Sequence, residues 1–467
     1  MDIKTIKTIE SATEKSLSSF AKLSFSLLFL LAVFLWTYSS HGKVPDNTFL
    51  IIGAIFGAYM ALNIGANDVA NNVGPAVGAR ALTLTGAIII AAIFESAGAI
   101  IAGGDVVNTI KSGIINPNLI TDKNSFIWAM TAGLLAGAVW LNFATSIGAP
   151  VSTTHAIVGG VMGAGIASAG FSILNWGSLA EIASSWVISP LLGGIVAAGF
   201  LYFIKKQIVY KENMIEQAQK FVPILIAIMT WAFTTYLILK GLKQLVNISF
   251  LFASGISLLF AFVAYYITKK SIDKNLSNLT NDRSSVNKLF TPALIFGAAL
   301  LSFAHGANDV SNAIGPLAAI NDAIMHGGTS VKASVPFWIM VVGAIGIVIG
   351  LILYGPRLIK TVGSEITELD QMRAFSVAMA TAVTVIIASQ MGLPVSSTHI
   401  AIGGVFGVGF LREALDMTEK NYVQDIREKF KKHKKELEKL KADLFKLESL
   451  KDKNKSTYVK IVDLFKK

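Results

Sequence analysis

The stretch "NIGANDVANNVGPAVG" at residues 63–78 returns, with few changes, as "AHGANDVSNAIGPLAA" at 304–319. Both copies place an Asn-Asp pair between glycines, shortly before a Gly-Pro step and inside long apolar runs. A carboxylate within a membrane helix is costly and indicates a functional site. This duplication therefore decides how the rest of the chain is interpreted.

The composition is that of a polytopic, all-α membrane protein. The chain has 467 residues, of which 53% are hydrophobic and 15% are charged, whereas soluble domains average about 25% charged residues. Apolar runs recur at lengths that cross a bilayer, about 17–25 residues. These runs lie at 20–39, 48–66, 84–103, 126–148, 177–204, 221–239, 249–268, 289–304, 335–355 and 374–393.

The first apolar run, "LSFSLLFLLAVFLW", resembles the core of a signal peptide, but no small-x-small cleavage site follows it. We therefore predict a retained extra membrane helix in residues 1–45. The chain contains no cysteine, which excludes disulfides and thiolate metal sites.

The net charge of +11 is concentrated in loops and in the tail. Basic loops at 205–212 and 269–275 are separated by two apolar runs, so they lie on one side, which the Lys/Arg bias assigns to the cytoplasm. Basic charge here indicates topology and anionic lipid rather than nucleic acid. The tail, 416–467, has heptad-like apolar spacing, which predicts a basic amphipathic cytoplasmic helix, either in a short coiled coil or without a partner.

A second motif is also duplicated, as "ATSIGAPVSTTHAIVGGVMGAG" at 144–165 and "ASQMGLPVSSTHIAIGGVFGVG" at 388–409. Two homologous halves in a membrane protein indicate a transporter with a pseudo-two-fold axis. The pattern alone leaves inverted and parallel repeats both open. The predicted division, after the first helix, is transport repeat 1 at 46–205, scaffold helices and loops at 206–288, transport repeat 2 at 289–415, and the tail.

The first motif predicts a cation site. Its candidate ligands are Asn67, Asp68, Asn71, Asn308, Asp309 and Asn312. The two amides of each copy share a helix face and the carboxylate lies about 100° away, so all three converge only if the helix is broken. The flanking glycines and Gly-Pro steps favour such breaks. Carboxylate, amide and carbonyl oxygens suit Na⁺, Mg²⁺ or Ca²⁺. The structural alternative is that these residues only cap and join helices.

The second motif predicts an anion site. Pro150 and Pro394 end one helix, and a run of hydroxyls opens the next. The candidate ligands are Ser152, Thr153, Thr154, Ser396, Ser397 and Thr398. The short flanking segments fit re-entrant helical hairpins that meet within the membrane. Free N–H groups, a partial positive charge and hydroxyls at two helix N-termini can hold an oxyanion without a basic side chain. Ordinary N-capping is the alternative.

The charges of the two motifs link the sites. Neither motif contains Lys or Arg, and a dianion beside Asp68 and Asp309 would gather about four negative charges. At ~5 Å and an effective dielectric constant of ~20, each unit pair repels by roughly 3 kcal/mol, and helix dipoles supply only ~0.3–2 kcal/mol each. Bound cations must offset this repulsion, which is the physical basis of symport. Na⁺ is the simplest candidate, and protonation of the aspartates is the alternative.

Glu95, His155 and His399 are accessory candidates. Glu95 is an unduplicated intramembrane carboxylate whose counterpart lies near Ile347; it either assists a cation or proton or hydrogen-bonds structurally. His155 and His399 end the second motif and are interpreted as orienting the hydroxyls rather than as general bases. Basic residues near the span ends are interpreted as snorkelling to the interface. These are Arg80, Lys111, Arg357 and Lys360.

The pairs GANDVAN/GANDVSNA and GAPVSTTH/GLPVSSTH resemble the inorganic phosphate transporter family, also called the Pit or solute carrier 20 type. The resemblance covers about 50–205 and 290–412 and looks like a prokaryotic sodium-dependent member. It implies inverted repeats, about twelve membrane segments and a homodimer. It also implies that the serine and threonine motif holds phosphate, that the Asn-Asp motif belongs to the transport site, and that Glu95 is functionally essential.

This sequence departs from the family at two places. Animal members carry a second glutamate, at a position aligned here with Ala378, so the cation site is expected to differ. Their long intracellular loop is shortened here to 205–290.

We predict a secondary active symporter in the cell (inner) membrane that imports inorganic phosphate with sodium ions, without another cofactor and without enzymatic activity. The alternatives are a proton-coupled carrier of phosphate or metal-phosphate, a carrier of another tetrahedral oxyanion, a membrane phosphatase that uses the two histidines, and a receptor or channel.

Overall fold

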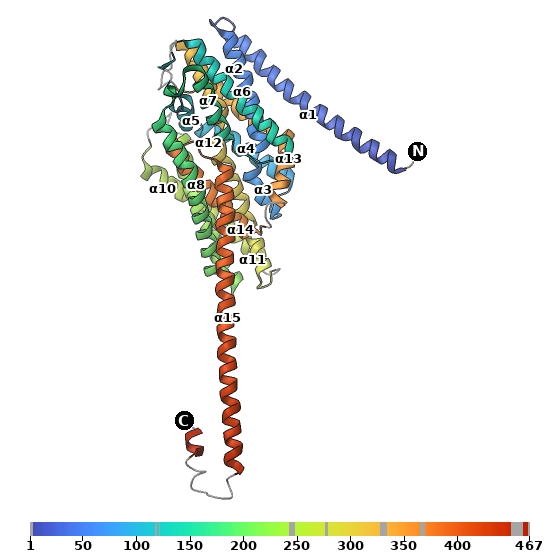
Figure 1. The fold of residues 1–467 in the computed structure, drawn as a ribbon, viewed down its shortest axis with the longest axis vertical. Coiled ribbons are helices and arrows are strands. Elements are labelled where there is room, and N and C mark those ends of the chain that lie inside the picture. Colours follow the sequence, from blue (N-terminus) through green and yellow to red (C-terminus); the bar gives the residue numbers. More distant parts are fainter. Residues whose placement is uncertain are drawn as a thin grey trace. The chain divides into compact units, whose positions relative to one another are not determined.

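The computed structural model describes residues 3–116, 119–120, 122–241, 248–275, 279–326, 334–364, 369–449 and 461–465. These residues are overwhelmingly helical, and they contain no strand, only an isolated bridge between Ile115 and Leu174. They form two compact units, Met1–Val408 and Gly409–Lys467 (Figure 1). The predicted all-α class is confirmed.

The helices follow one another with short connections. The first half contains α1 (Ile3–His41), α2 (Asn47–Asn67), α3 (Ala70–Gly78), α4 (Leu84–Ala102), α5 (Gly104–Asn108), a π-helical turn η1 (Thr109–Gly113), α6 (Lys123–Ile147), α7 (Thr153–Ala169), a 3₁₀ turn η3 (Phe171–Ile173) and α8 (Trp176–Ile204), extended by the π-helical turn η4 (Lys205–Val209). Then come α9 (Met214–Gly241), α10 (Phe250–Asn275), α11 (Arg283–Leu289), α12 (Thr291–His326), α13 (Phe337–Ser364), α14 (Gln371–Gln390) and α15 (Ser397–Ser449).

Ten helices in the described parts are long and apolar enough to cross a membrane, and they coincide with the ten apolar runs of the sequence. α7, with 17 residues, and the first turns of α15 add two further apolar segments. The expectation of about twelve membrane segments stays a prediction.

Contacts between connections define two sides of the bundle. Side A is where α2 begins, and Lys123, at the start of α6, pairs with Asp46 there (2.8 Å). Side B is where α12 begins, and the side chain of Asn281, just before α11, donates to the Glu212 carbonyl ahead of α9. The far end of α12 returns to side A, because Asp322 pairs with Lys111 of η1. α2 therefore runs from A to B and α12 from B to A, so the repeats are inverted.

Glycine packing confirms the pseudo-symmetry independently of sequence. A Cβ added to Gly65 would overlap the carbonyl oxygen of Ile347 in α13, and one added to Gly306 would overlap that of Glu95 in α4. The two motif-bearing helices are thus crossed by equivalent neighbours at equivalent points. Ile347 is the structural counterpart of Glu95, as the sequence alignment indicated.

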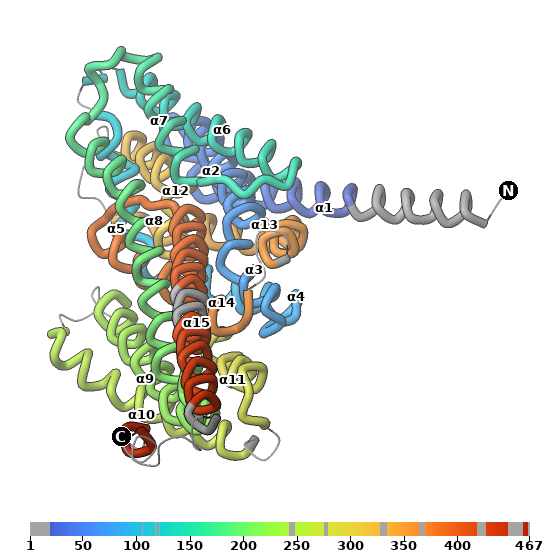
Figure 2. The backbone as a smooth tube through the Cα atoms, turned by 60° about the horizontal axis from the view of Figure 1, so that its bottom comes forward, coloured from blue at the N-terminus to red at the C-terminus, as the bar shows by residue number. Residues whose placement is uncertain are grey.

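The two hairpins enter from opposite sides. α6 starts on side A, and the segment after α7 returns there, since Asn116 donates its N–H to the Ile173 carbonyl (2.8 Å). α14 starts on side B, where Asp370 contacts Arg283 (3.4 Å). Figure 2 shows the first turns of α15 alongside α8, and a Cβ on Gly403 would overlap the Pro190 carbonyl. These are the predicted re-entrant hairpins.

One expectation about the motif helices was wrong in the second half. In repeat 1 the helix is interrupted at Asp68–Val69, between α2 and α3. In repeat 2, α12 continues through Asp309 and Pro316. Ser311, which replaces Ala70, donates its hydroxyl to the Asn308 carbonyl within this turn (2.5 Å).

Lys111 also differs from its interpretation as a snorkelling residue. It is only 2% exposed and forms the buried pair with Asp322. A buried ammonium needs a partner of opposite charge, and the carboxylate at the end of α12 supplies it.

The unit from Gly409 onward is helical to Ser449, and the predicted apolar positions, Ile426, Phe430, Leu437, Leu440 and Leu444, are exposed. At the other end of the chain, α1 packs against α2 and α13. A role for either segment stays a prediction.

Candidate functional site

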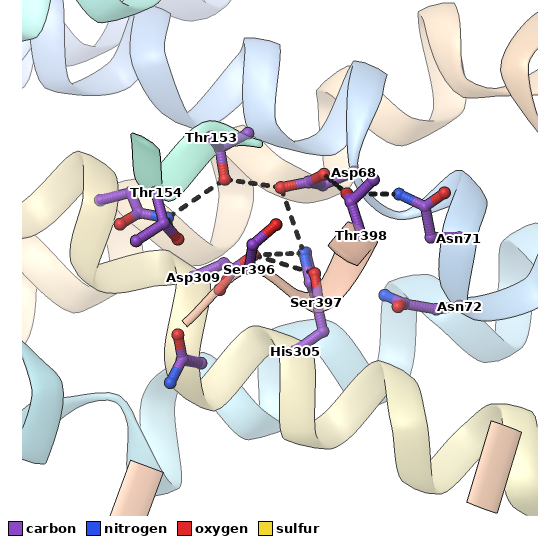
Figure 3. A network of polar contacts seen from close by, with 12 residues as sticks. Asp68, Asn71, Asn72, Thr153, Thr154, His305, Asp309, Ser396, Ser397 and Thr398 are labelled. Carbon is purple, nitrogen blue, oxygen red and sulfur yellow. Dashed lines mark hydrogen bonds and ion pairs between the residues drawn. The ribbon is translucent and has the colours of Figure 1, made fainter. Parts of the chain in front are cut away.

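The site lies where α2–α3 and α12 meet the tips of the two hairpins. Figure 3 shows Asp68, His305 and Asp309 facing hydroxyls that come from the start of α7 and from the start of α15. All these side chains are buried. The two motifs that are far apart in the sequence therefore form a single polar centre.

The first asparagine of each motif holds a hairpin tip. The amide nitrogen of Asn67 donates to Thr145 Oγ1 and to the Ala149 carbonyl, both at 3.0 Å, and its oxygen accepts from the Val151 N–H. In repeat 2, Asn308 makes the equivalent contacts. Its partners are Ser389 Oγ (2.9 Å), the Leu393 carbonyl (3.1 Å) and the Val395 N–H (3.3 Å). These amides position the tips, and a role as sodium ligands stays a prediction.

The serines cap the two helices that open at the tips. Ser152 Oγ accepts the N–H of His155 (3.1 Å), and Ser396 Oγ accepts that of His399 (3.2 Å). Thr154 then donates to the Val395 carbonyl of the other hairpin (2.9 Å). The two helix N-termini are therefore in contact, so their partial positive charges face one centre.

Asp68 joins both hairpins. Thr153 donates to one of its carboxylate oxygens (2.5 Å), and Thr398, from the other repeat, donates to the second (2.6 Å). Asp309 has a weaker hydroxyl contact, from Ser397 at 3.3 Å. Candidate anion ligands and candidate cation ligands are thus bonded directly to one another.

The second asparagine of each motif crosses to the opposite repeat. Asn71 donates to Thr398 Oγ1 (2.8 Å), while Asn312 donates to Thr153 and Thr154 Oγ1, both at 3.1 Å. These crossed contacts link each motif helix to the hairpin that enters from the other side.

The two repeats differ chemically by one histidine–glutamate pair. The Nδ1 of His305 lies 2.7 Å from Glu95, and its Nε2 lies 2.9 Å from Asp309 and 3.8 Å from Asp68. Glu95 also accepts from the side chain of Asn72 (2.6 Å). The equivalent positions in the other half are Ile64 and Ile347. Glu95 therefore reaches the centre through His305.

The centre contains oxygen atoms that suit a hard cation. One ligand atom each from Asp68, His305 and Asp309 lie within 4.8 Å of one another. Asp309 Oδ1 and Asn312 Oδ1 are buried without a hydrogen-bond partner among the described residues. Unsatisfied carboxylate and amide oxygens suit a hard cation such as Na⁺, Mg²⁺ or Ca²⁺, so the donor set fits an ion of this class.

His155 and His399 contact each other (ring centroids 4.8 Å apart), and His155 also packs edge-on against Trp186 (3.9 Å). Their rings help to join the hairpins, whereas the interpretation that they orient hydroxyls stays a prediction.

Sequence reasoning missed His305, Asn72 and the tip residues Thr145 and Ser389. His305 was detectable, because it is the polar replacement between "NIGAND" and "AHGAND". The tip pair was also detectable, since both members carry a hydroxyl at the same place in "ATSIGAP" and "ASQMGLP".

Comparisons with known proteins agree with this geometry. The model of the Phosphate transporter family matches residues 64–438. A Helicobacter pylori (strain J99) protein named "Putative phosphate permease" is 54% identical over 418 residues, covering 89% of this chain and 78% of the relative. A Thermococcus kodakarensis protein with a name of the same kind is 39% identical over 387 residues, with coverage of 81% and 93%.

A solved structure described as "The sodium-dependent phosphate transporter" superimposes with a TM-score of 0.74 at 36% identity, covering 78% of this chain and 90% of the other. With the duplicated motifs gathered around one buried centre, the chain belongs to the phosphate transporter family.

Proposed function

We propose that this protein imports inorganic phosphate across the cell membrane by sodium-coupled symport. The observation that carries the proposal is the direct contact between hydroxyls at two facing helix N-termini and the buried aspartates. In this assignment Ser152–Thr154 and Ser396–Thr398 hold phosphate. Asp68, Asp309 and the motif asparagines hold sodium ions.

The electrostatics require cations and anion together. Phosphate that approaches the hydroxyls must displace their hydrogen bonds to Asp68, which leaves carboxylate and phosphate charges adjacent in a buried site. A sodium ion bound by the aspartates removes that repulsion, so each ligand strengthens the binding of the other. The name of the solved relative, a sodium-dependent phosphate transporter, supports the same choice of cation.

A proton is the second candidate for the coupling ion. His305 is a buried titratable group that contacts Glu95 and Asp309, so a proton on this cluster could replace a cation. Phosphate uptake into proteoliposomes, with sodium and pH gradients imposed separately, decides between them. Sodium coupling predicts rapid uptake after a sodium jump at equal pH, whereas uptake driven only by the pH gradient would overturn it.

The inverted repeats suggest how access alternates. The hairpin α6–α7 enters from side A and α14–α15 from side B, so movement of the hairpins against the scaffold would expose the centre to each side in turn. Side B carries the Lys/Arg-rich loops, and we assign it to the cytoplasm together with the tail.

We also retain the homodimer that the resemblance implied. Crosslinking of the protein in native membranes tests it, and a monomer at all crosslinker concentrations would exclude it.

Binding and translocation need no covalent step, so we assign no enzymatic activity; hydrolysis of a phosphoester by the pure protein would contradict this.

A further inference from the structure

A basic pocket lies beside one hairpin tip, away from the centre described above. Its volume is about 600 Å³, and it is lined by Ile147, Gly148, Pro356, Arg357, Lys360 and Thr361. The last four belong to the final turns of α13, which ends on side B, and the first two belong to the tip. Both basic side chains are exposed in this structure.

The pocket adjoins the segment that carries the anion motif. Arg357 donates to the Ser146 carbonyl (3.1 Å), and its guanidinium packs on Gly148, where φ is +79°. The next residue, Ala149, accepts the hydrogen bond from Asn67 at the centre. One arginine nitrogen thus caps the end of α6, while a guanidinium has five N–H donors in total.

The equivalent place on side A is built differently. There Thr109, the counterpart of Thr361, donates its hydroxyl to the carbonyl of Gly392, the counterpart of Gly148 (2.6 Å). Asn108 stands where repeat 2 has Lys360. On side B, Thr361 donates instead to the Arg357 carbonyl of its own helix (3.3 Å). On side A the threonine joins the helix to the tip, whereas on side B the arginine makes that contact and the two segments border a cationic cavity.

We propose that this pocket is a second phosphate-binding site, which binds the free anion transiently on side B. The centre contains three carboxylates, so a phosphate ion that has left the centre is repelled by them. The two cationic side chains of the pocket would hold this anion close to the hairpin tip. The same chemistry could bind the phosphate of a lipid headgroup. The position of the pocket against the tip favours the free ion. The proposal rests on the proposed function for the direction in which the anion moves.

The absence of native cysteine allows a direct test. In Thr361→Cys, the single thiol would line the pocket, and its reaction rates with anionic and cationic methanethiosulfonates report the local potential. We expect the ratio of the anionic to the cationic reaction rate to be roughly threefold to tenfold higher at this thiol than at a free thiol in solution at low salt. Millimolar inorganic phosphate should slow the reaction of this thiol with a neutral methanethiosulfonate, compared with chloride at equal ionic strength.

Charge variants made in the Thr361→Cys background identify the source of the potential. Lys360→Gln leaves the contact of Arg357 with the tip untouched and should lower the preference, and Arg357→Gln with Lys360→Gln should abolish it and the protection by phosphate. The matched control is Lys269→Gln with Lys270→Gln, which removes two positive charges from the basic end of α10, outside the pocket. It should change neither readout.

Lipid composition separates the two sources of phosphate. Protection by inorganic phosphate in phosphatidylcholine nanodiscs supports the proposal. Protection only by phosphatidylglycerol, or an anionic preference that survives the double substitution, would overturn it. None of these readouts requires transport, so a failure of sodium-coupled uptake would leave the pocket result intact.

Discussion

The two crossings at which a motif helix meets its neighbour have the same backbone and opposite chemistry. Where α13 crosses α2, Gly65 meets the Ile347 carbonyl, and Ile64 precedes that glycine. Where α4 crosses α12, Gly306 meets the Glu95 carbonyl, and His305, which precedes that glycine, contacts the Glu95 carboxylate. Backbone packing at both points is set by a glycine that admits a carbonyl. The same backbone crossing thus accommodates either pair, and a role of the polar pair in transport is a prediction that substitution can test.

The aspartates should give the largest effect, with Asp68 exceeding Asp309. Asp68→Asn removes a charge that accepts hydroxyls from both repeats, and hydrogen bonds to charged groups contribute about 1.5–3 kcal/mol each. We expect sodium-driven phosphate uptake in proteoliposomes to fall by at least ~100-fold. Asp46→Asn, an equal change at an exposed ion pair on side A, is the control. Uptake by Asp68→Asn with unaltered sodium dependence would refute its role.

Making the second crossing resemble the first tests whether Glu95 and His305 act as a unit. His305→Ile leaves the Glu95 carboxylate buried without its imidazole, which should lower the free energy of unfolding by about 3–5 kcal/mol. Glu95→Ile with His305→Ile should restore most of that stability while uptake stays low. Thermal unfolding in detergent measures the first quantity and proteoliposome flux the second.

If the double variant is as unstable as the single one, the two residues are not a structural pair. If it transports normally, the polar crossing has no role in function.

The glycines at the crossings should have equal effects despite the different side chains around them. Gly65→Ala and Gly306→Ala each place a methyl group on a backbone carbonyl, and overpacking of this kind costs typically 1–3 kcal/mol. Gly297→Ala is a matched control in α12, since its Cβ would meet only ordinary contacts, the nearest at 3.6 Å. Melting temperatures that differ strongly between the first two variants would contradict the equivalence of the crossings.

The sequence predicted the parts that rest on local pattern. The duplicated motifs predicted the repeats. The hydroxyl runs after Pro150 and Pro394 predicted the hairpins and the position of their hydroxyls near the aspartates, because helix caps and helix breaks depend on local sequence. The motif pattern alone left the inversion open, because it depends on the number of crossings between the copies, and only the family resemblance implied it. The Glu95–His305 pair was missed, because it depends on how α4 crosses α12, across 210 residues. The continuity of α12 through Asp309 and Pro316 was also missed, because the glycine and proline around the second motif match those of the first, where the helix is interrupted.

The caps of the two hairpin helices should show the smallest effect and the closest symmetry. Ser152 and Ser396 accept equivalent backbone N–H groups at 3.1 and 3.2 Å, and replacing such a cap by alanine costs about 1 kcal/mol. Ser152→Ala and Ser396→Ala should therefore lower stability alike. If both hydroxyls also hold phosphate, the KM for phosphate should rise a few-fold in each, with the sodium dependence unchanged. Equal loss of stability with a KM change in one variant only would mean that the anion sits against one hairpin, and that the symmetry of the fold does not extend to its substrate.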